Sequence, residues 1–131
     1  MKRIFFLLMV LILVLSVISC AQEKKSINAP ELEELAKEFV ELLVAEDFNE
    51  AAKMFDDKMR EALPVEKLQK TWEGLISQMG SFQKELSAEA EEVKGNKLVV
   101  VKCQFEKSAI DIRVVFNKAK KVSGLWFAPA K

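Results

Sequence analysis

The stretch from Leu98 to Phe127 constrains the fold of this chain more than any other part. Apolar residues occupy alternate positions along it, and turn residues interrupt the alternation at regular intervals. A period of two is the pattern of strands that bury one face, so the stretch predicts three antiparallel strands. Together with Phe82 to Lys94 in front of it, the stretch predicts a four-stranded meander.

Short turns fix which residues of neighbouring strands lie opposite each other. We place the turns at Gly95-Asn96, at Lys107-Ser108 and around Ala119-Lys120. The expected cross-strand pairs are Ala90 with Val101, Ala88 with Cys103, Leu86 with Phe105, Phe105 with Ile110, Cys103 with Ile112, Val101 with Val114, Val99 with Phe116, Val114 with Leu125 and Ile112 with Phe127. Every pair is apolar, so the three turns predict one continuous core face, and a slip by one residue would turn a strand over.

The opposite face of the expected sheet is mixed. Its apolar residues are Leu98, Val100, Val115, Val122 and Trp126, and the charged ones among them are Lys102, Asp111 and Arg113. The register aligns Glu89, Lys102, Arg113 and Trp126 in one row, so Glu89 would pair with Lys102 and Arg113 would stack on Trp126. An apolar patch with charged edges is typical of partner surfaces. Our candidates for partner binding are Lys102, Asp111, Arg113 and Trp126, and the alternative is a solvated sheet face.

Three helices are expected before the sheet. The first begins near Pro30 with Asn28 as its cap, the second follows a capping box that starts at Asp47, and the third runs from Val65 to Met79. Their apolar stripes are Leu32, Leu35, Ala36, Phe39, Leu42 and Leu43; Phe48, Ala51, Ala52, Met54 and Phe55; and Leu68, Trp72, Leu75, Ile76 and Met79. The predicted fold class is therefore α+β, with three N-terminal helices packed on one face of a curved four-stranded antiparallel meander.

The N-terminus has the layout of a secretory signal. Lys2 and Arg3 precede an unbroken apolar run, and small residues then lead to Cys20. The run from Ile4 to Ser19 has 16 residues, fewer than the roughly 20 that a helix needs to span a bilayer, so a transmembrane anchor is the weaker alternative. The residues Val17-Ile18-Ser19-Cys20 resemble the bacterial lipobox, and this resemblance implies cleavage before Cys20 and lipidation of its sulfur.

The expected organisation is a signal peptide over residues 1–19, a lipidated tether over 20–29 and an α+β domain over 30–131. Such a protein would be lipid-anchored in the cell envelope, on the extracytoplasmic side of a membrane. Without Lys2 and Arg3, the chain keeps 18 of its 20 basic residues and all 20 acidic ones, a net formal charge of −2. Nucleic-acid binding would need a basic face, so this balance argues against it.

A set of residues spread over the expected domain carries a resemblance to known proteins: Phe39 to Leu43, Asp47-Phe48, Ala51-Ala52, Met54 to Asp56, Leu63-Pro64, Lys67-Leu68, Trp72, Gly80, Phe82, Phe105 to Lys107, Asp111 to Phe116, Gly124-Leu125 and Phe127. In these residues the chain, from residue 31 to about residue 129, resembles a bacterial family of unknown function within the nuclear-transport-factor-2-like superfamily, often found N-terminal to α/β-hydrolase domains. Ser108 stands where the family commonly has glycine, and residues 118–121 lack the usual Asp or Gly. The resemblance implies a cone of helices against a curved sheet, sometimes with a small molecule inside it.

Residues that would line such a cone are Trp72, Met79, Phe105, Ile112 and Phe127, although core packing explains the same residues. The inner face offers no Asp, Glu or Lys between Val99 and Phe116, and the chain has no histidine and no G-x-S-x-G element. Acid/base catalysis needs a titratable group in its pocket. Cys103 lacks a histidine partner, and apolar neighbours would raise its pKa. No metal-ligand spacing is present either, so we expect no enzyme and no cofactor.

The expected function is that of a membrane-anchored extracytoplasmic lipoprotein module that binds a protein partner, or a second copy as a homodimer, through the mixed sheet face. The alternative is a carrier of a small apolar ligand in the cone between helices and sheet. A third reading, a weak enzyme in that cavity, lacks a residue to carry the chemistry.

Overall fold

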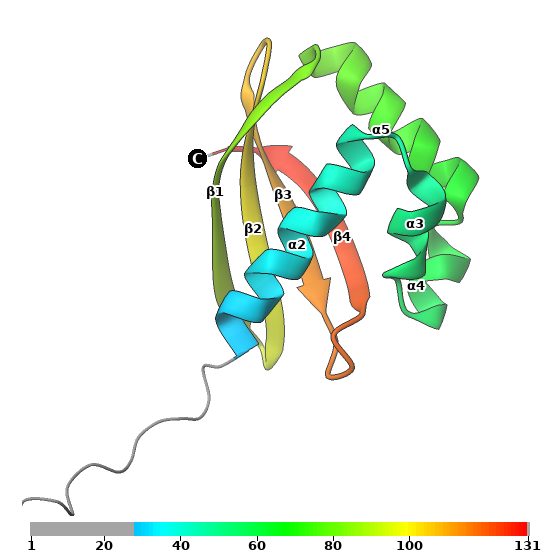
Figure 1. Ribbon diagram of the computed structural model, residues 1–131, viewed down its shortest axis with the longest axis vertical. Coiled ribbons are helices and arrows are strands. Elements are labelled where there is room, and N and C mark those ends of the chain that lie inside the picture. Colours follow the sequence, from blue (N-terminus) through cyan, green and yellow to red (C-terminus); the bar gives the residue numbers. More distant parts are fainter. Residues whose placement is uncertain (1–27, 131) are drawn as a thin grey trace, which may run out of the picture.

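Four helices precede four strands in residues 28–130, the part of the chain that the computed structural model describes. Figure 1 shows α2 (Asn28–Val44), α3 (Phe48–Lys53), α4 (Asp57–Ala62), α5 (Val65–Met79), β1 (Phe82–Val93), β2 (Asn96–Phe105), β3 (Ala109–Phe116) and β4 (Val122–Pro129). The strands form one antiparallel sheet in the order β1-β2-β3-β4. The expected α+β class and meander are therefore confirmed. The predicted signal peptide and Cys20 lie outside the described residues.

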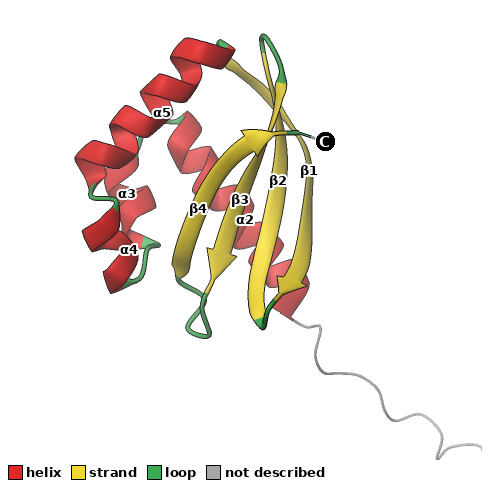
Figure 2. Ribbon diagram, turned by 180° about the vertical axis from the view of Figure 1, so that it is seen from behind, coloured by secondary structure: helices red, strands yellow, loops and turns green. Residues whose placement is uncertain are grey.

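All four helices lie on one side of the sheet, as the two opposite views show (Figures 1 and 2). α2 packs against β1 and β2 and crosses in front of the sheet in Figure 1, whereas α3, α4 and α5 form a group nearer to β4. Within residues 28–130, no helix has both the length and the apolar composition required to cross a bilayer.

The core lies between the helices and the inner face of the sheet. The expected inward residues in the middle of the sheet, on β2 and β3, are buried: Val99, Val101, Cys103, Phe105, Ile110, Ile112 and Val114. Phe39 and Phe55 link α2 to the segment after α3, with ring centroids 5.7 Å apart, and Trp72 of α5 packs on Phe105 of β2, with centroids 5.9 Å apart. The inner face is therefore closed by apolar contacts from both helical groups.

The helix termini follow their sequence signals, with one addition. α5 has the predicted bounds, and the Asp47 side chain caps α3 by accepting a hydrogen bond from the Glu50 amide at 3.3 Å. The prediction of three helices is wrong, because α4 is a fourth within the described residues. Its cap is Asp56, which accepts from the Met59 amide at 2.7 Å. α4 buries no residue, so it carries no apolar stripe that would reveal it.

The register between β3 and β4 is the predicted one over most of its length. Val114 lies opposite Leu125, and Ile112 lies opposite Phe127. An irregularity beyond Val115 then places Val122 opposite Phe116, and Val122 is fully buried. The expectation that Val122 belongs to the outer face is therefore wrong, because a local bulge changes which face a strand residue occupies.

The other two registers differ from the prediction by two residues. The turn between β1 and β2 is Lys94-Gly95, whose φ angles of 52° and 81° are both positive, as a type I′ hairpin requires. Ala88 consequently lies opposite Val101, and not opposite Cys103. A shift by an even number keeps every side chain on its face, so the predicted core survives the wrong pairing.

The turn between β2 and β3 is held from outside by the end of α5. The amides of Glu106 and Lys107 donate to the carbonyls of Ser81 and Met79, at 3.1 and 2.9 Å. The Glu106 carboxylate accepts from the Ser81 amide at 2.8 Å in return. These bonds centre the turn on Glu106-Lys107, so Cys103 lies opposite Ile110 and not opposite Ile112.

Two irregularities in β1 change its inner face. They lie between Phe82 and Lys84 and between Glu85 and Ser87. Leu86, expected opposite Phe105, is 44% exposed, and half-buried Glu85 lies opposite Cys103. The inward placement of Leu86 is therefore wrong.

Both edges of the sheet carry contacts from the helical layer. At the β1 edge, the Ala90 amide donates to the Glu33 carboxylate of α2 at 3.2 Å. At the β4 edge, Val122 exchanges backbone hydrogen bonds with Met54 and Asp56, at 2.7 and 2.9 Å. Part of each edge is thus already paired.

Candidate functional site

The outer face of the sheet is the candidate site, because no helix among the described residues covers it (Figure 2). Trp126 projects from this face with 58% of its surface exposed, more than Val44, Leu86 or Val93. The strands hold their outward side chains at fixed spacing, so the face presents a set geometry to whatever binds it.

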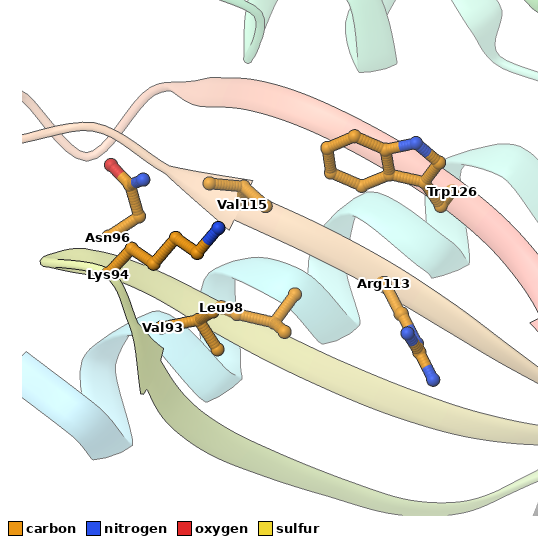
Figure 3. Close-up of a pocket in the computed structure, with 7 residues that line it drawn as sticks. All are labelled: Val93, Lys94, Asn96, Leu98, Arg113, Val115 and Trp126. Atoms are coloured by element: carbon orange, nitrogen blue, oxygen red, sulfur yellow. The ribbon is translucent and has the colours of Figure 1, made fainter.

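A groove of about 380 Å³ runs along this face, which we call the Trp126 groove (Figure 3). It is lined by Val93, Lys94, Asn96, Leu98, Arg113, Val115 and Trp126. The indole extends towards Val115 and lies over Gly124, where an added Cβ would come within 2.8 Å of the ring. Gly124 therefore makes the room that lets Trp126 lie along the groove.

A second hollow of about 330 Å³ adjoins the groove, which we call the Asp111 hollow. It is lined by Ser87, Glu89, Glu91, Val100, Lys102, Asp111 and Arg113. Arg113 borders both spaces. Asp111 is only 5% exposed, although its side chain belongs to the outer face.

Two buried polar atoms of this site have no hydrogen-bond partner among the described residues: Asp111 Oδ1, an acceptor, and Arg113 Nε, a donor. A buried polar atom without a partner costs about 1 to 3 kcal/mol. Such atoms are uncommon in folded proteins and call for an explanation, for which a bound group is one candidate.

The structure brings the four predicted partner-binding residues together on one face, but not in the predicted row. The row across the four strands is Glu89, Val100, Arg113 and Trp126. Lys102 lies instead opposite Ser87 and Asp111, because both the β1–β2 and the β2–β3 registers are shifted by two residues. The expected stacking of Arg113 on Trp126 is also wrong, because the guanidinium points away from the indole (Figure 3).

The five residues expected to line a cone contribute to the core. Trp72, Phe105 and Ile112 are buried, and Met79 and Phe127 pack against them. A hollow of about 270 Å³ touches Trp72 from outside and is completed by Val44, Glu46, Ile76, Ser81 and Phe82. Trp72 is the one residue of the five that borders this hollow.

The inner face holds a thiol and a carboxylate. Burial, together with the nearby Glu85 and Asp111 charges, raises the pKa of Cys103 to about 12. Burial also raises the pKa of Glu85, as do Glu41 and Glu34, whereas Lys37 lowers it. We did not predict that Glu85 would lie on the inner face. Strict alternation from Phe82 would place Lys84 in the core, and this improbable position for a lysine signals that the strand is irregular.

No group of three or more His, Cys, Asp or Glu side chains within residues 28–130 is arranged to hold a metal ion. The inner face therefore presents a thiol and a carboxylate opposite each other and no metal-ligand cluster among the described residues.

Comparison with known proteins gives one match. The model of a family described as "protein of unknown function (DUF3887)" matches residues 36–125, from α2 to β4. No curated protein and no solved structure matches the chain. The site must therefore be interpreted from its own geometry.

Proposed function

We propose, from the premise that this chain belongs to the family described as protein of unknown function DUF3887, that it is a non-catalytic lipoprotein module. In this proposal, the domain adopts the nuclear-transport-factor-2-like cone and is anchored by lipid on Cys20, on the extracytoplasmic side of a membrane. Its outer sheet face binds a protein partner, or a second copy of the chain.

The pair of partnerless atoms at Asp111 and Arg113 carries this proposal. They lie beside an exposed tryptophan, and Trp and Arg are the residues that most often dominate binding energy at interfaces. A partner backbone offers both an N–H donor for Asp111 Oδ1 and a carbonyl acceptor for Arg113 Nε. Binding would therefore relieve two unfavourable atoms while burying the indole of Trp126.

The absence of catalysis is part of the proposal, and the inner face supports it. A thiol with a pKa of about 12 is almost entirely protonated at neutral pH and is a poor nucleophile. Glu85 lies opposite Cys103 in the pairing of β1 and β2, and the chain has no histidine that could pair with either group.

Binding through the outer face is tested with Trp126→Asp and Arg113→Glu in the full chain. Val44→Asp is the matched control, because Val44 is an exposed apolar residue on the helical side, 38% exposed. Sedimentation measures self-association, and photo-crosslinking from residue 115, which also lines the Trp126 groove, measures a partner in whole cells. We expect the two outer-face variants to lose the larger species or the crosslink, and the control to keep it. Unchanged profiles in all variants would contradict the proposal.

The lipid anchor is tested separately, by labelling cells with radioactive palmitate. Wild-type protein should take up label, and Cys20→Ala should not, because Cys20 supplies the modified sulfur. An unlabelled wild-type protein would contradict this part alone.

The alternative function, a carrier of a small apolar ligand, is supported by the hollow beside Trp72. Its volume of about 270 Å³ falls just below the range usual for ligand sites. Native mass spectrometry of gently purified protein would show a co-bound molecule, and its loss in Ile76→Trp would place it in this hollow.

A further inference from the structure

One end of the molecule collects lysines from segments that are far apart in the sequence. α2 begins at this end, beside the turn between β1 and β2 and the loop between β3 and β4 (Figures 1 and 2). We call it the lysine end, and its members, all exposed, are Lys94, Lys97, Lys118, Lys120 and Lys121. Acidic side chains lie at the same end, Glu31 and Glu33 on α2 and Glu91 and Glu92 on β1, so this end is rich in lysine but also carries negative charge.

The loop that carries three of these lysines is ordered by one side chain. Asn117 Oδ1 accepts from the amides of Ala119 and Lys121, at 2.9 and 3.0 Å. Lys120 has a φ angle of 63°, a left-handed conformation that this compact loop imposes. The lysines are therefore presented from a defined loop, even though the loop lacks the glycine or aspartate expected there.

A hollow of about 380 Å³ opens between the two hairpin ends and α2, which we call the basic hollow. It is lined by Leu32, Gly95, Asn96, Lys97, Phe116, Asn117, Lys118 and Lys120. Ammonium groups and a side-chain amide around an apolar floor suit a phosphate group that is attached to an apolar body.

The lysines are not neutralised within the domain. Lys120 pairs with Glu31 at 2.7 Å and Lys97 pairs with Glu92 at 2.8 Å, but all four side chains are about half exposed, so these pairs are weak. Lys94, Lys118 and Lys121 form no ion pair with a described residue. Positive charge therefore remains available at this end.

The position of the lysine end relative to the proposed lipid anchor indicates that its partner is a membrane surface. Seven residues lie between Cys20 and Asn28, where α2 begins, and the eight steps of chain from one to the other reach at most about 30 Å. A lipid on Cys20 would thus hold the start of α2, and the lysines beside it, close to a bilayer surface.

We propose that the lysine end lies against the membrane and binds the phosphate groups of anionic lipids, with the basic hollow taking one headgroup. This inference rests on the lipid anchor of the proposed function. Lysines near an anionic bilayer each add to membrane affinity and act over about a Debye length. Lys94 also lines the end of the Trp126 groove, and the rest of the outer sheet face stays open to a partner.

The test is a lysine footprint on the full chain reconstituted into vesicles. Lysines are acetylated briefly and quantified by mass spectrometry, in phosphatidylcholine vesicles and in vesicles that also contain phosphatidylglycerol. We expect acetylation of Lys94, Lys118 and Lys121 to fall about fivefold in the anionic vesicles, and to recover at high salt. Lys67 and Lys70 on α5, also exposed, should react equally in both vesicle types.

Two triple charge-reversal variants, one at the lysine end and one away from it, provide the matched comparison. Lys94, Lys118 and Lys121 changed together to Glu should abolish the difference between vesicle types. Lys67, Lys70 and Lys107 changed together to Glu alter the net charge equally but lie away from the lysine end, so the footprint should persist. Lys97 and Lys120 are left intact, because reversing them would set like charges against Glu92 and Glu31.

Each remaining outcome decides the matter. Equal footprints in the two vesicle types, or loss of the footprint in both triple variants, overturn the proposal. Protection of the same lysines by millimolar inorganic phosphate without vesicles would assign the hollow to a soluble anion and overturn the lipid surface. Flotation of the chain with both vesicle types but no footprint overturns this inference and leaves the anchor standing. Flotation with anionic vesicles alone supports the lysine end and counts against the anchor.

Discussion

The two faces of the sheet are built from the same strands, yet they differ in how completely their side chains are satisfied. The inner face is closed: Val99, Val101 and Ile112 are fully buried against the helices. The outer face keeps Trp126 exposed and leaves atoms of Asp111 and Arg113 without partners. The comparison shows that the inner face accounts for folding, whereas the outer face carries features that folding alone does not require.

The largest expected difference between the two faces concerns their tryptophans. Trp72→Ala removes a ring that packs on Phe105 and Phe127, so we expect the free energy of unfolding to fall by about 3 to 5 kcal/mol. Trp126→Ala should change it by about 0.5 kcal/mol or less, since the ring is 58% exposed. Urea unfolding measures both, and equal losses would break the comparison.

The second prediction concerns the buried thiol of the inner face. The pKa of Cys103 is about 12 in the fold, above the ordinary value of 9.0, so the folded state binds the proton more tightly than the unfolded state. Tighter proton binding by the folded state stabilises the fold. This stabilisation is complete below pH 9 and is lost as the pH rises towards 12. Between pH 9 and 10.5, the wild type should lose about 1 to 2 kcal/mol more than Cys103→Ala. Parallel stability curves for the two proteins would refute the shift.

The third prediction concerns the charge of the outer face. Asp111→Asn keeps the shape of the side chain but removes a charge from the Asp111 hollow. We expect at least about tenfold weaker binding of the partner or second copy, with stability changed by no more than about 1 kcal/mol. Sedimentation or crosslinking yield, read beside thermal unfolding, separates the effects, and a loss of stability without a loss of binding would assign Asp111 to the fold.

The smallest expected effect is that of Glu85, the carboxylate on the inner side of β1. Its pKa is raised chiefly by burial, so its ionised form is disfavoured in the fold and opposes folding at neutral pH. Glu85→Gln should therefore raise the stability at pH 7, by less than about 1 kcal/mol because the side chain is only half-buried. The gain should vanish below pH 4, where wild-type Glu85 is protonated. A gain that is independent of pH would exclude this electrostatic cause.

The sequence predicted the core better than the pairing of the strands. Alternation alone identifies which residues face inward, and an even shift in register leaves that set unchanged, as Ala88 and Val101 show. The turn of β2 and β3 could not be placed from local residues, because bonds from Ser81 and Met79 hold it. α4 stayed hidden because it buries nothing.

The sequence predicted which residues share the outer face of the sheet, but not how they are arranged on it. Exposed apolar and charged residues at alternate positions were enough to name Asp111, Arg113 and Trp126. The Asp111 hollow depends on Lys102 lying opposite Asp111, which follows from the non-local register of β2 and β3. The partnerless atoms depend on burial by neighbouring strands, which no local pattern encodes.

The pairing of both sheet edges has a consequence for the mode of recognition. Many proteins bind a peptide by adding it to a free sheet edge as one more strand. This mode recognises the peptide backbone and therefore tolerates many sequences. Here the Glu33 carboxylate accepts a hydrogen bond from the Ala90 amide on β1, and Met54 and Asp56 form backbone hydrogen bonds with Val122 at the start of β4. Strand addition at those positions would have to displace existing bonds. A partner that instead lies across the strands meets side chains first, so its selection would depend on what it places against Trp126 and Asp111.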